Sequence, residues 1–125
     1  MINDENDFAA SPGSPPVATR NRSIVAEEGQ QIIAYAGASV IAMANSFVTA
    51  HRDSIVFARP SSRVTAEEGA MVRGSPGASI VAKSGALVVA EPGCFVTAMH
   101  GATVWAAPGA IINDLGANII WTTEI

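Results

Sequence analysis

Small and β-branched residues recur every eight residues from Ser23 to Ile125, without an insertion or a deletion. If each eight-residue unit is numbered from Ser23, its fourth position is alanine through Ala106, except at Gly74, and its eighth position is small in most units. Side chains alternate between the two faces of a strand, so positions eight, two and four share one face. This uniform face predicts the core. The second position is always β-branched and aliphatic, as strands favour, and we expect it to form the centre of that core: Ile24, Ile32, Val40, Val48, Val56, Val64, Val72, Ile80, Val88, Val96, Val104, Ile112 and Ile120.

The seventh position of each of the first eleven units is a residue typical of turns. Glycine there accepts a positive φ, and Asn, Asp or Ser can hydrogen-bond to the local backbone. Each unit is therefore predicted to be one short strand followed by one tight corner. Glycine or proline in nearly every unit excludes a helix. The residues predicted to shape the corners are Gly29, Gly37, Asn45, Asp53, Ser61, Gly69, Gly77, Gly85, Gly93, Gly101 and Gly109.

A second period of sixteen residues sets the number of units in one coil. Prolines at the sixth position lie sixteen residues apart, at Pro60, Pro76, Pro92 and Pro108. The third position also differs between odd and even units, and a coil of three units would mix the two sets. The predicted fold is all-β: a two-layered parallel β-solenoid with sixteen residues per coil and about six and a half coils. Alanine and valine suit the thin slot between two such sheets.

The first 22 residues do not follow this pattern. The run from Ser11 to Pro16 contains three prolines and one glycine, which suits neither a helix nor a central strand. We expect residues 1–22 to be a flexible arm and residues 23–125 to be the solenoid.

The two outer faces of the predicted solenoid differ. Thr49, Thr65 and Thr97 lie on the even face but are interrupted by Val81 and other residues, so they do not form a regular threonine array. The odd face is apolar, and a large exposed apolar patch usually marks an interaction site. We expect an interface on the odd face at Val25, Ile41, Ile55, Phe57, Met71, Leu87, Val89, Trp105, Ile119 and Trp121.

The repeat decays towards the C-terminus, where polar residues enter the core columns. An open solenoid end exposes unpaired strand edges, and repeat proteins usually carry capping units there. Two interpretations remain open: a polar plug that stops strand pairing, or a specific contact with the next subunit. The residues concerned are Asp114, Asn118, Thr122 and Ile125.

Composition and charge narrow the function classes. The net charge of −4 argues against a nucleic-acid-binding surface, which needs a basic face. No apolar run reaches the roughly 18 residues of a membrane span, and the acidic N-terminus does not have the profile of a signal peptide. The default expectation is therefore a cytoplasmic protein, with an extracellular or virion-associated location as the alternative.

The residue types that carry catalysis are sparse and separated. His51 and His100 lie three predicted coils apart, too far to share a metal within one subunit. Cys94 occupies a small-residue core position and is expected to be a buried, inert thiol. We expect no catalytic residue, cofactor or metal site, and no enzyme.

Residues 23–125 resemble the octapeptide-repeat β-solenoids of bacterial and phage proteins. The sixteen-residue coil is similar to that of ice-nucleation protein repeats, although their threonine column is not regular here. A proline-bearing arm before a compact β-helix resembles the organisation of bactofilins, which are bacterial filament proteins.

These features favour a structural protein that self-associates through its apolar face, its open ends or both, into a homo-oligomer or filament. One alternative is a spike or adaptor module that docks on a larger protein machine through its N-terminal arm or its tip. The lesser alternative is an ice- or surface-binding solenoid.

Overall fold

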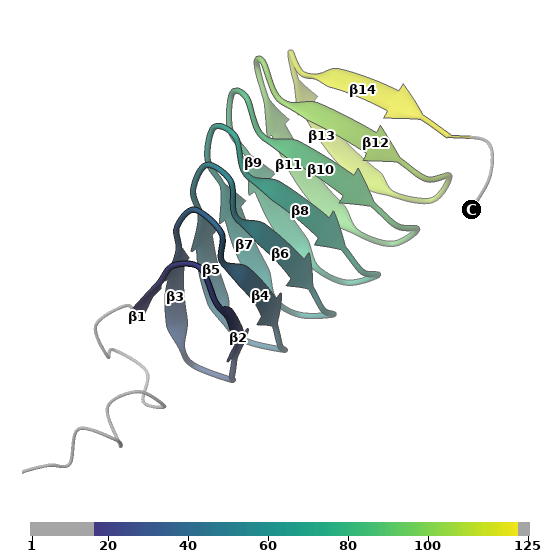
Figure 1. Cartoon of the computed structure of the whole chain (residues 1–125). Helices are drawn as coiled ribbons and strands as arrows, with labels where there is room; N and C mark the ends of the chain where they lie inside the picture. Colours follow the sequence, from purple (N-terminus) through teal and green to yellow (C-terminus); the bar gives the residue numbers. More distant parts are fainter. Residues whose placement is uncertain (1–16, 123–125) are drawn as a thin grey trace, which may run out of the picture.

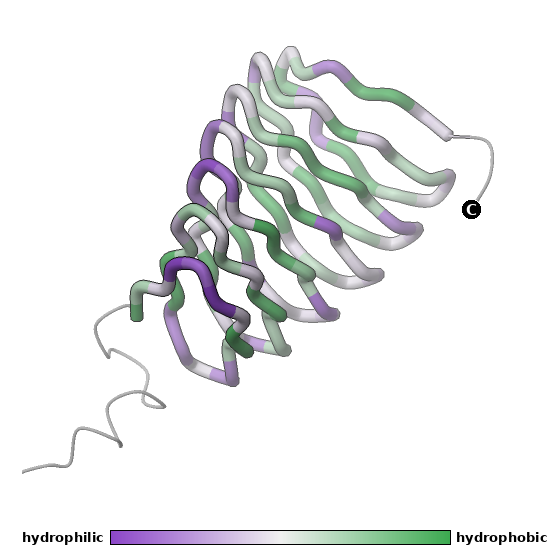
Figure 2. The backbone as a smooth tube through the Cα atoms, viewed as in Figure 1, coloured by the Kyte–Doolittle hydropathy of each residue, from purple (hydrophilic) through white to green (hydrophobic). Residues whose placement is uncertain are grey.

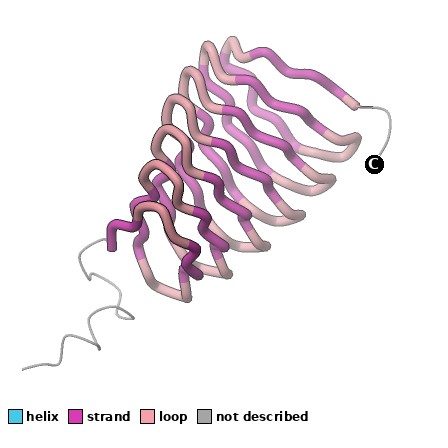
Figure 3. Tube along the Cα trace, in the orientation of Figure 1, coloured by secondary structure: helices cyan, strands magenta, loops and turns pink. Residues whose placement is uncertain are grey.

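The computed structural model describes residues 17–122 as a stack of β strands wound into a solenoid (Figure 1). No residue in this range lies in a helix (Figure 3). The strands are β1 (Val17–Thr19), β2 (Ser23–Ala26), β3 (Gln31–Ala34), β4 (Ser39–Ala42), β5 (Phe47–Ala50), β6 (Ile55–Ala58), β7 (Arg63–Ala66), β8 (Met71–Gly74), β9 (Ser79–Ala82), β10 (Leu87–Ala90), β11 (Phe95–Met99), β12 (Thr103–Ala106), β13 (Ile111–Leu115) and β14 (Asn118–Trp121).

The chain alternates between two seven-stranded sheets. Odd-numbered strands form sheet A and even-numbered strands form sheet B, each stacked in chain order with parallel pairing. Two successive strands make one turn, so the solenoid has seven turns. Paired residues are sixteen apart, as in Val40 with Val56, except between β1 and β3 and between β12 and β14, where they are fifteen apart. The prediction of a two-layered parallel β-solenoid with sixteen-residue coils is confirmed.

The core lies in the slot between the two sheets. Val40, Val56 and Val72 are fully buried there, and so are Ala42 and Ala58. In the hydropathy view the apolar strands contrast with the more hydrophilic corners (Figure 2). Because alanine and valine are small, the sheets approach closely and leave no room for a large side chain. The volume of each inward residue therefore matters.

Gly74 shows how tightly the slot is filled. It replaces alanine in the column of fourth positions, and a β-carbon built on it would lie 2.6 Å from Ile80 Cδ1 and would also collide with Cys94 Sγ. Ile80 and Cys94 are both larger than the residues usual at their positions. The glycine compensates for their extra volume.

The corners adopt the predicted left-handed backbone. All eleven residues predicted to shape the corners have a positive φ, including Asn45, Asp53 and Ser61. At these three, which are not glycine, the next residue is a serine whose hydroxyl donates a hydrogen bond to the carbonyl three residues earlier. The donor–acceptor distances are 2.7 Å for Ser46, 2.6 Å for Ser54 and 2.6 Å for Ser62. The hydroxyls hold the corners where the backbone conformation is least favourable.

The start of the solenoid differs from the prediction. Strand β1 occupies Val17–Thr19, inside the segment expected to be a flexible arm, and it pairs with β3. The solenoid therefore begins at Val17 rather than Ser23, and it has seven turns rather than six and a half. The rest of the predicted arm, residues 1–16, lies outside the described residues.

The C-terminal register also differs from the prediction. Ile119 pairs with Val104 and faces the core, whereas Ile120 pairs with Trp105 and faces outward. The reason is a shortened corner. Asp114 Oδ1 accepts hydrogen bonds from the backbone N–H groups of Gly116 at 2.9 Å and the next residue at 2.8 Å. This tight turn brings the chain into sheet B one residue early.

The structure therefore places three residues in a different column from the one predicted. Ile120 was predicted to be in the core and lies on the outer side of β14. Ile119 was predicted on the outer face and is half-buried against the core. Trp121 was also predicted on the outer face; it pairs with Ala106, in the inward column, and at the end of the stack it is 54% exposed.

Candidate interaction surfaces

The outer face of sheet B carries a nearly continuous apolar column. Neighbouring strands place its members directly beside one another, because their pairing is in register. Phe57 and Trp105 are each 44% exposed, which is high for large aromatic side chains. We call this set the sheet B column: Val25, Ile41, Phe57, Arg73, Val89, Trp105 and Ile120.

A second column of sheet B, two residues earlier on each strand, broadens the apolar face. Ile55, Met71 and Leu87 are adjacent in it. Eight of the ten residues expected at this interface therefore lie on one face, and Ile119 and Trp121 do not. Arg73 interrupts the apolar surface, and its Nε lies 3.3 Å from Glu91 Oε2 of the same chain. The charge within the stripe thus has a partner in its own chain.

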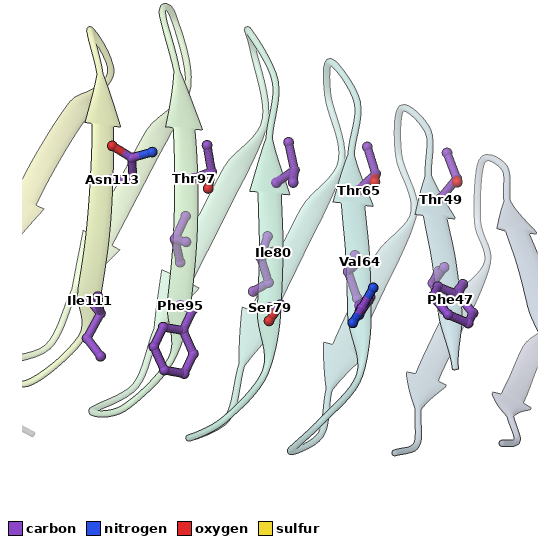
Figure 4. Close-up of a pocket in the computed structure, with 14 residues that line it drawn as sticks. Phe47, Thr49, Val64, Thr65, Ser79, Ile80, Phe95, Thr97, Ile111 and Asn113 are labelled. Atoms are coloured by element: carbon purple, nitrogen blue, oxygen red, sulfur yellow. The ribbon is translucent and has the colours of Figure 1, made fainter. Parts of the chain in front are cut away.

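The outer face of sheet A is hollowed by a shallow groove of about 550 Å³. Figure 4 shows two rows of side chains along it, with Phe47, Ser79 and Phe95 in one row and threonines in the other. The Arg63 guanidinium carbon lies 5.7 Å from the centre of the Phe47 ring. Because Ser79 is small, the row is interrupted beside Phe95. The groove therefore has aromatic walls at Phe47 and Phe95, and its deepest part, called the low point below, lies at the small side chain of Ser79.

The threonines of sheet A line up only in part. Thr49 pairs with Thr65, but Thr65 then pairs with Val81, and Thr97 pairs with Asn113. The column is therefore interrupted, and it borders a groove rather than a flat plane. This geometry differs from a regular threonine array.

One edge of the solenoid carries stacked polar side chains. The Arg20 guanidinium lies 5.2 Å from the Tyr35 ring centre, and the Tyr35 ring stacks on His51 at 5.0 Å. Further along the same edge, Lys83 Nζ lies 3.1 Å from Glu67 Oε2. These contacts link successive turns and make this edge polar. No three His, Cys, Asp or Glu side chains between residues 17 and 122 are grouped to hold a metal ion.

Cys94 is fully buried in the slot. Desolvation by burial, with a smaller contribution from the charge of Glu91, raises the pKa of Cys94 to about 12. The side chain is therefore a neutral thiol at neutral pH, whereas the thiolate is the nucleophilic form. Its role in the described part of the chain is to fill the space opposite Gly74.

Within residues 17–122, partly buried apolar side chains lie at both ends of the solenoid. Val17 and Ile24 at the first turn, and Ile112 and Ile119 at the last, are half-buried and pack against the core from one side. The N–H of Asn118 donates a hydrogen bond to the carbonyl of Ala102, just before β12, and the N–H of Thr122 donates to the carbonyl of Ala106 at the end of β12.

The residues expected at the C-terminal end fall into three groups. Asp114 and Asn118 belong to the last turn, Thr122 follows it directly, and Ile125 lies outside the described residues. The eight-residue pattern does not reach the N-terminal end, at Val17 and Thr19. The signal for this end is a seven-residue spacing between Val17 and Ile24.

Comparison with known proteins gives no match: no protein-family model, no curated protein and no solved structure is similar to this chain. The resemblances to ice-nucleation repeats and bactofilins therefore rest on the repeat and its organisation alone. In the part of the chain that the structure describes, no helix is long and apolar enough to cross a membrane.

Proposed function

We propose that this protein is a non-enzymatic structural subunit that self-associates into a homo-oligomer or filament through sheet B and its open ends. The observation that carries the proposal is the sheet B column, in which six of seven adjacent residues are apolar. Aromatic residues and methionine are enriched at protein interfaces. An apolar sheet face suits contact with an identical face, because a two-fold interface uses the same patch on both subunits.

The experiment places carboxylates in the sheet B column and compares them with carboxylates on the other sheet. The variant is Phe57→Glu/Trp105→Glu, and the matched control is Thr49→Glu/Thr97→Glu on the outer face of sheet A. All four side chains point outward, so the strands are retained, as far-ultraviolet circular dichroism will show. Sedimentation velocity and negative-stain electron microscopy measure assembly.

We expect wild type and the control to assemble, and the sheet B variant to lose lateral association because carboxylates on both partners repel and resist desolvation. Lateral association that persists in the sheet B variant shows that this face is not the contact. Wild type that is monomeric at every concentration contradicts the proposed function itself.

The groove on sheet A favours a second function, that of a binding module. Its aromatic walls at Phe47 and Phe95, with the low point at Ser79, suit the apolar side chain of a partner protein. Filling the low point with Ser79→Phe should then abolish binding of that partner without affecting self-assembly. If assembly is lost instead, the groove belongs to the self-contact.

A further inference from the structure

The two terminal turns share a feature that is absent from the turns between them. Val17 and Ile24 are equivalent core positions only seven residues apart, and so are Ile112 and Ile119. Every other step between successive core positions is eight residues. Both short steps occur at the corner that leads from sheet A to sheet B. Each end of the solenoid thus has a corner that is one residue shorter than those beside it.

The two short corners match each other residue by residue. If the last turn of one chain is stacked on the first turn of a second copy, a single offset of ninety-five residues aligns both strands and the corner between them. The same offset aligns the two left-handed residues, Asn21 with a φ of 57° and Gly116 with a φ of 102°. The core pairs that result are Val17 with Ile112 and Ile24 with Ile119.

The half-buried residues at the two ends complement each other. Among residues 17–122, Val17 and Ile24 are partly buried and pack against the core from one side, as do Ile112 and Ile119. Stacking the ends would continue the slot and bury all four. It would also pair the strand edges β1 and β2 with β13 and β14, so that sheets A and B both run on across the junction. Open edges of this kind are templates for strand pairing.

A polar pair lies at the same junction. Thr19 is 4% exposed, and its Oγ1 is a buried side-chain oxygen with no hydrogen-bond partner among the described residues. Asp114 occupies the same inward column at the other end and is exposed. The offset places them on neighbouring strands, about 4.8 Å apart. At that spacing the Thr19 hydroxyl can donate to the Asp114 carboxylate.

The charges of the two corners are opposite. Arg20 and Arg22 flank the N-terminal short corner, the hydrophilic stretch between β1 and β2 in Figure 2. Asp114 is the charged residue of the described C-terminal corner. A like-with-like junction would bring the arginines of two N-terminal corners together, whereas an N-to-C junction brings arginines to a carboxylate. Charge therefore favours one polarity.

We infer that the C-terminal turn of one chain stacks on the N-terminal turn of a second copy, head to tail and in register, through the two matched seven-residue corners. This inference rests on the proposed self-assembly and specifies its partner surface and its direction. The junction leaves the same two ends free, and a head-to-tail contact that does not close on itself generates an open filament. The filament is polar.

Proline at each outer edge tests the junction. The Tyr35 N–H donates to the Thr19 carbonyl, so alternation places the N–H of Ala18 on the free side of β1. The Thr122 N–H donates to Ala106, so the N–H of Trp121 faces away from β12. Ala18→Pro and Trp121→Pro therefore block one end each, because proline is tolerated on a free strand edge but cannot donate to a new strand. Ala18→Val and Trp121→Val are the matched controls.

All of these variants are made with Phe57→Glu/Trp105→Glu, which removes lateral contact, and their masses are measured by light scattering after size-exclusion chromatography. We expect this background and both valine controls to form extended species, and each proline variant alone to be monomeric. An equimolar mixture of the two proline variants should double in mass and grow no further. Val17→Glu and Ile112→Glu, which put a charge on each half-buried end, replace any proline variant that does not fold.

Four results overturn the inference. A dimer of Ala18→Pro or Trp121→Pro alone shows that like ends meet. Proline variants that assemble like their valine controls show that the ends are not involved. If the Phe57→Glu/Trp105→Glu variant is monomeric while the wild-type chain assembles, the end junction is wrong and the proposed function still holds. If the wild-type chain is monomeric too, both fall.

Discussion

The five inner turns and the two terminal turns are built from the same kinds of residue, but they differ in corner length and in the residues of one core column. Inner turns have sixteen-residue spacing and a column of buried alanines such as Ala66. The terminal turns have one short corner each and carry Thr19 and Asp114 in that same column. In the described range, 17–122, an inner turn has a neighbouring turn on both sides, whereas a terminal turn has one. The terminal turns therefore have features of their own and are not simply further copies of the inner turn.

The largest effect is expected when the residue of a terminal turn is placed in an inner turn. Ala66→Asp puts a carboxylate into the alanine column where the side chain is fully buried. An unpaired buried charge should lower the free energy of unfolding by more than about 3 kcal/mol. Chemical denaturation followed by circular dichroism measures the loss. The control Thr65→Asp, one residue earlier and facing outward, should stay near wild type; equal stability of both variants would mean that the column is not buried.

A smaller effect is expected when a methyl group is added at the glycine that replaces alanine in an inner turn. Gly74→Ala should lower the free energy of unfolding by about 1–3 kcal/mol, because the new methyl group overpacks the slot against Ile80 and Cys94. Adding Ile80→Val and Cys94→Ala restores the residue types of the neighbouring turns and should recover most of the loss. If Gly74→Ala alone is as stable as wild type, the slot is looser than the structure indicates.

The smallest effect is expected at the terminal corner. Asp114→Ala removes the acceptor of two hydrogen bonds, from the N–H groups of Gly116 and Ala117. Each such bond contributes about 1 kcal/mol, and the loss should be confined to the last turn. Hydrogen exchange should quicken at these amides and stay unchanged in the inner turns, with Asp114→Asn as the conservative control. Faster exchange throughout the solenoid would show that the end is not a separate unit.

The inner turns could be predicted from the sequence because every position of the unit repeats there. The period located the strands, the two sheets and the left-handed corner residues. The ends could not be predicted, since a one-residue deletion in a corner leaves little trace. Ile119 and Ile120 are both isoleucine, so either fits the inward position, and the choice depends on the hydrogen bonds of Asp114. Val17 was missed because the eight-residue register does not reach it.

The repeat also explains why one outer surface could be predicted from the sequence and the other could not. Residues of the sheet B face such as Phe57 and Met71 follow the inner register and lie where the pattern placed them. The groove on sheet A depends on the volumes of adjacent side chains, above all the small Ser79 beside Phe95. A pattern of residue types does not show such a hollow until the strands are stacked.

The most direct measurement of the end junction is disulfide cross-linking between Ala18→Cys and Asn113→Cys. The ninety-five-residue offset places these two exposed, outward positions opposite each other on neighbouring strands. A spacing of about 4.8 Å is within the Cα–Cα range of disulfides. Buried Cys94 serves as the internal negative control. Our account predicts that the double variant oxidises to a ladder of multimers on non-reducing gels, while each single variant remains a monomer. Cross-linked dimers of Ala18→Cys alone, or a double variant that assembles without forming a ladder, would contradict it.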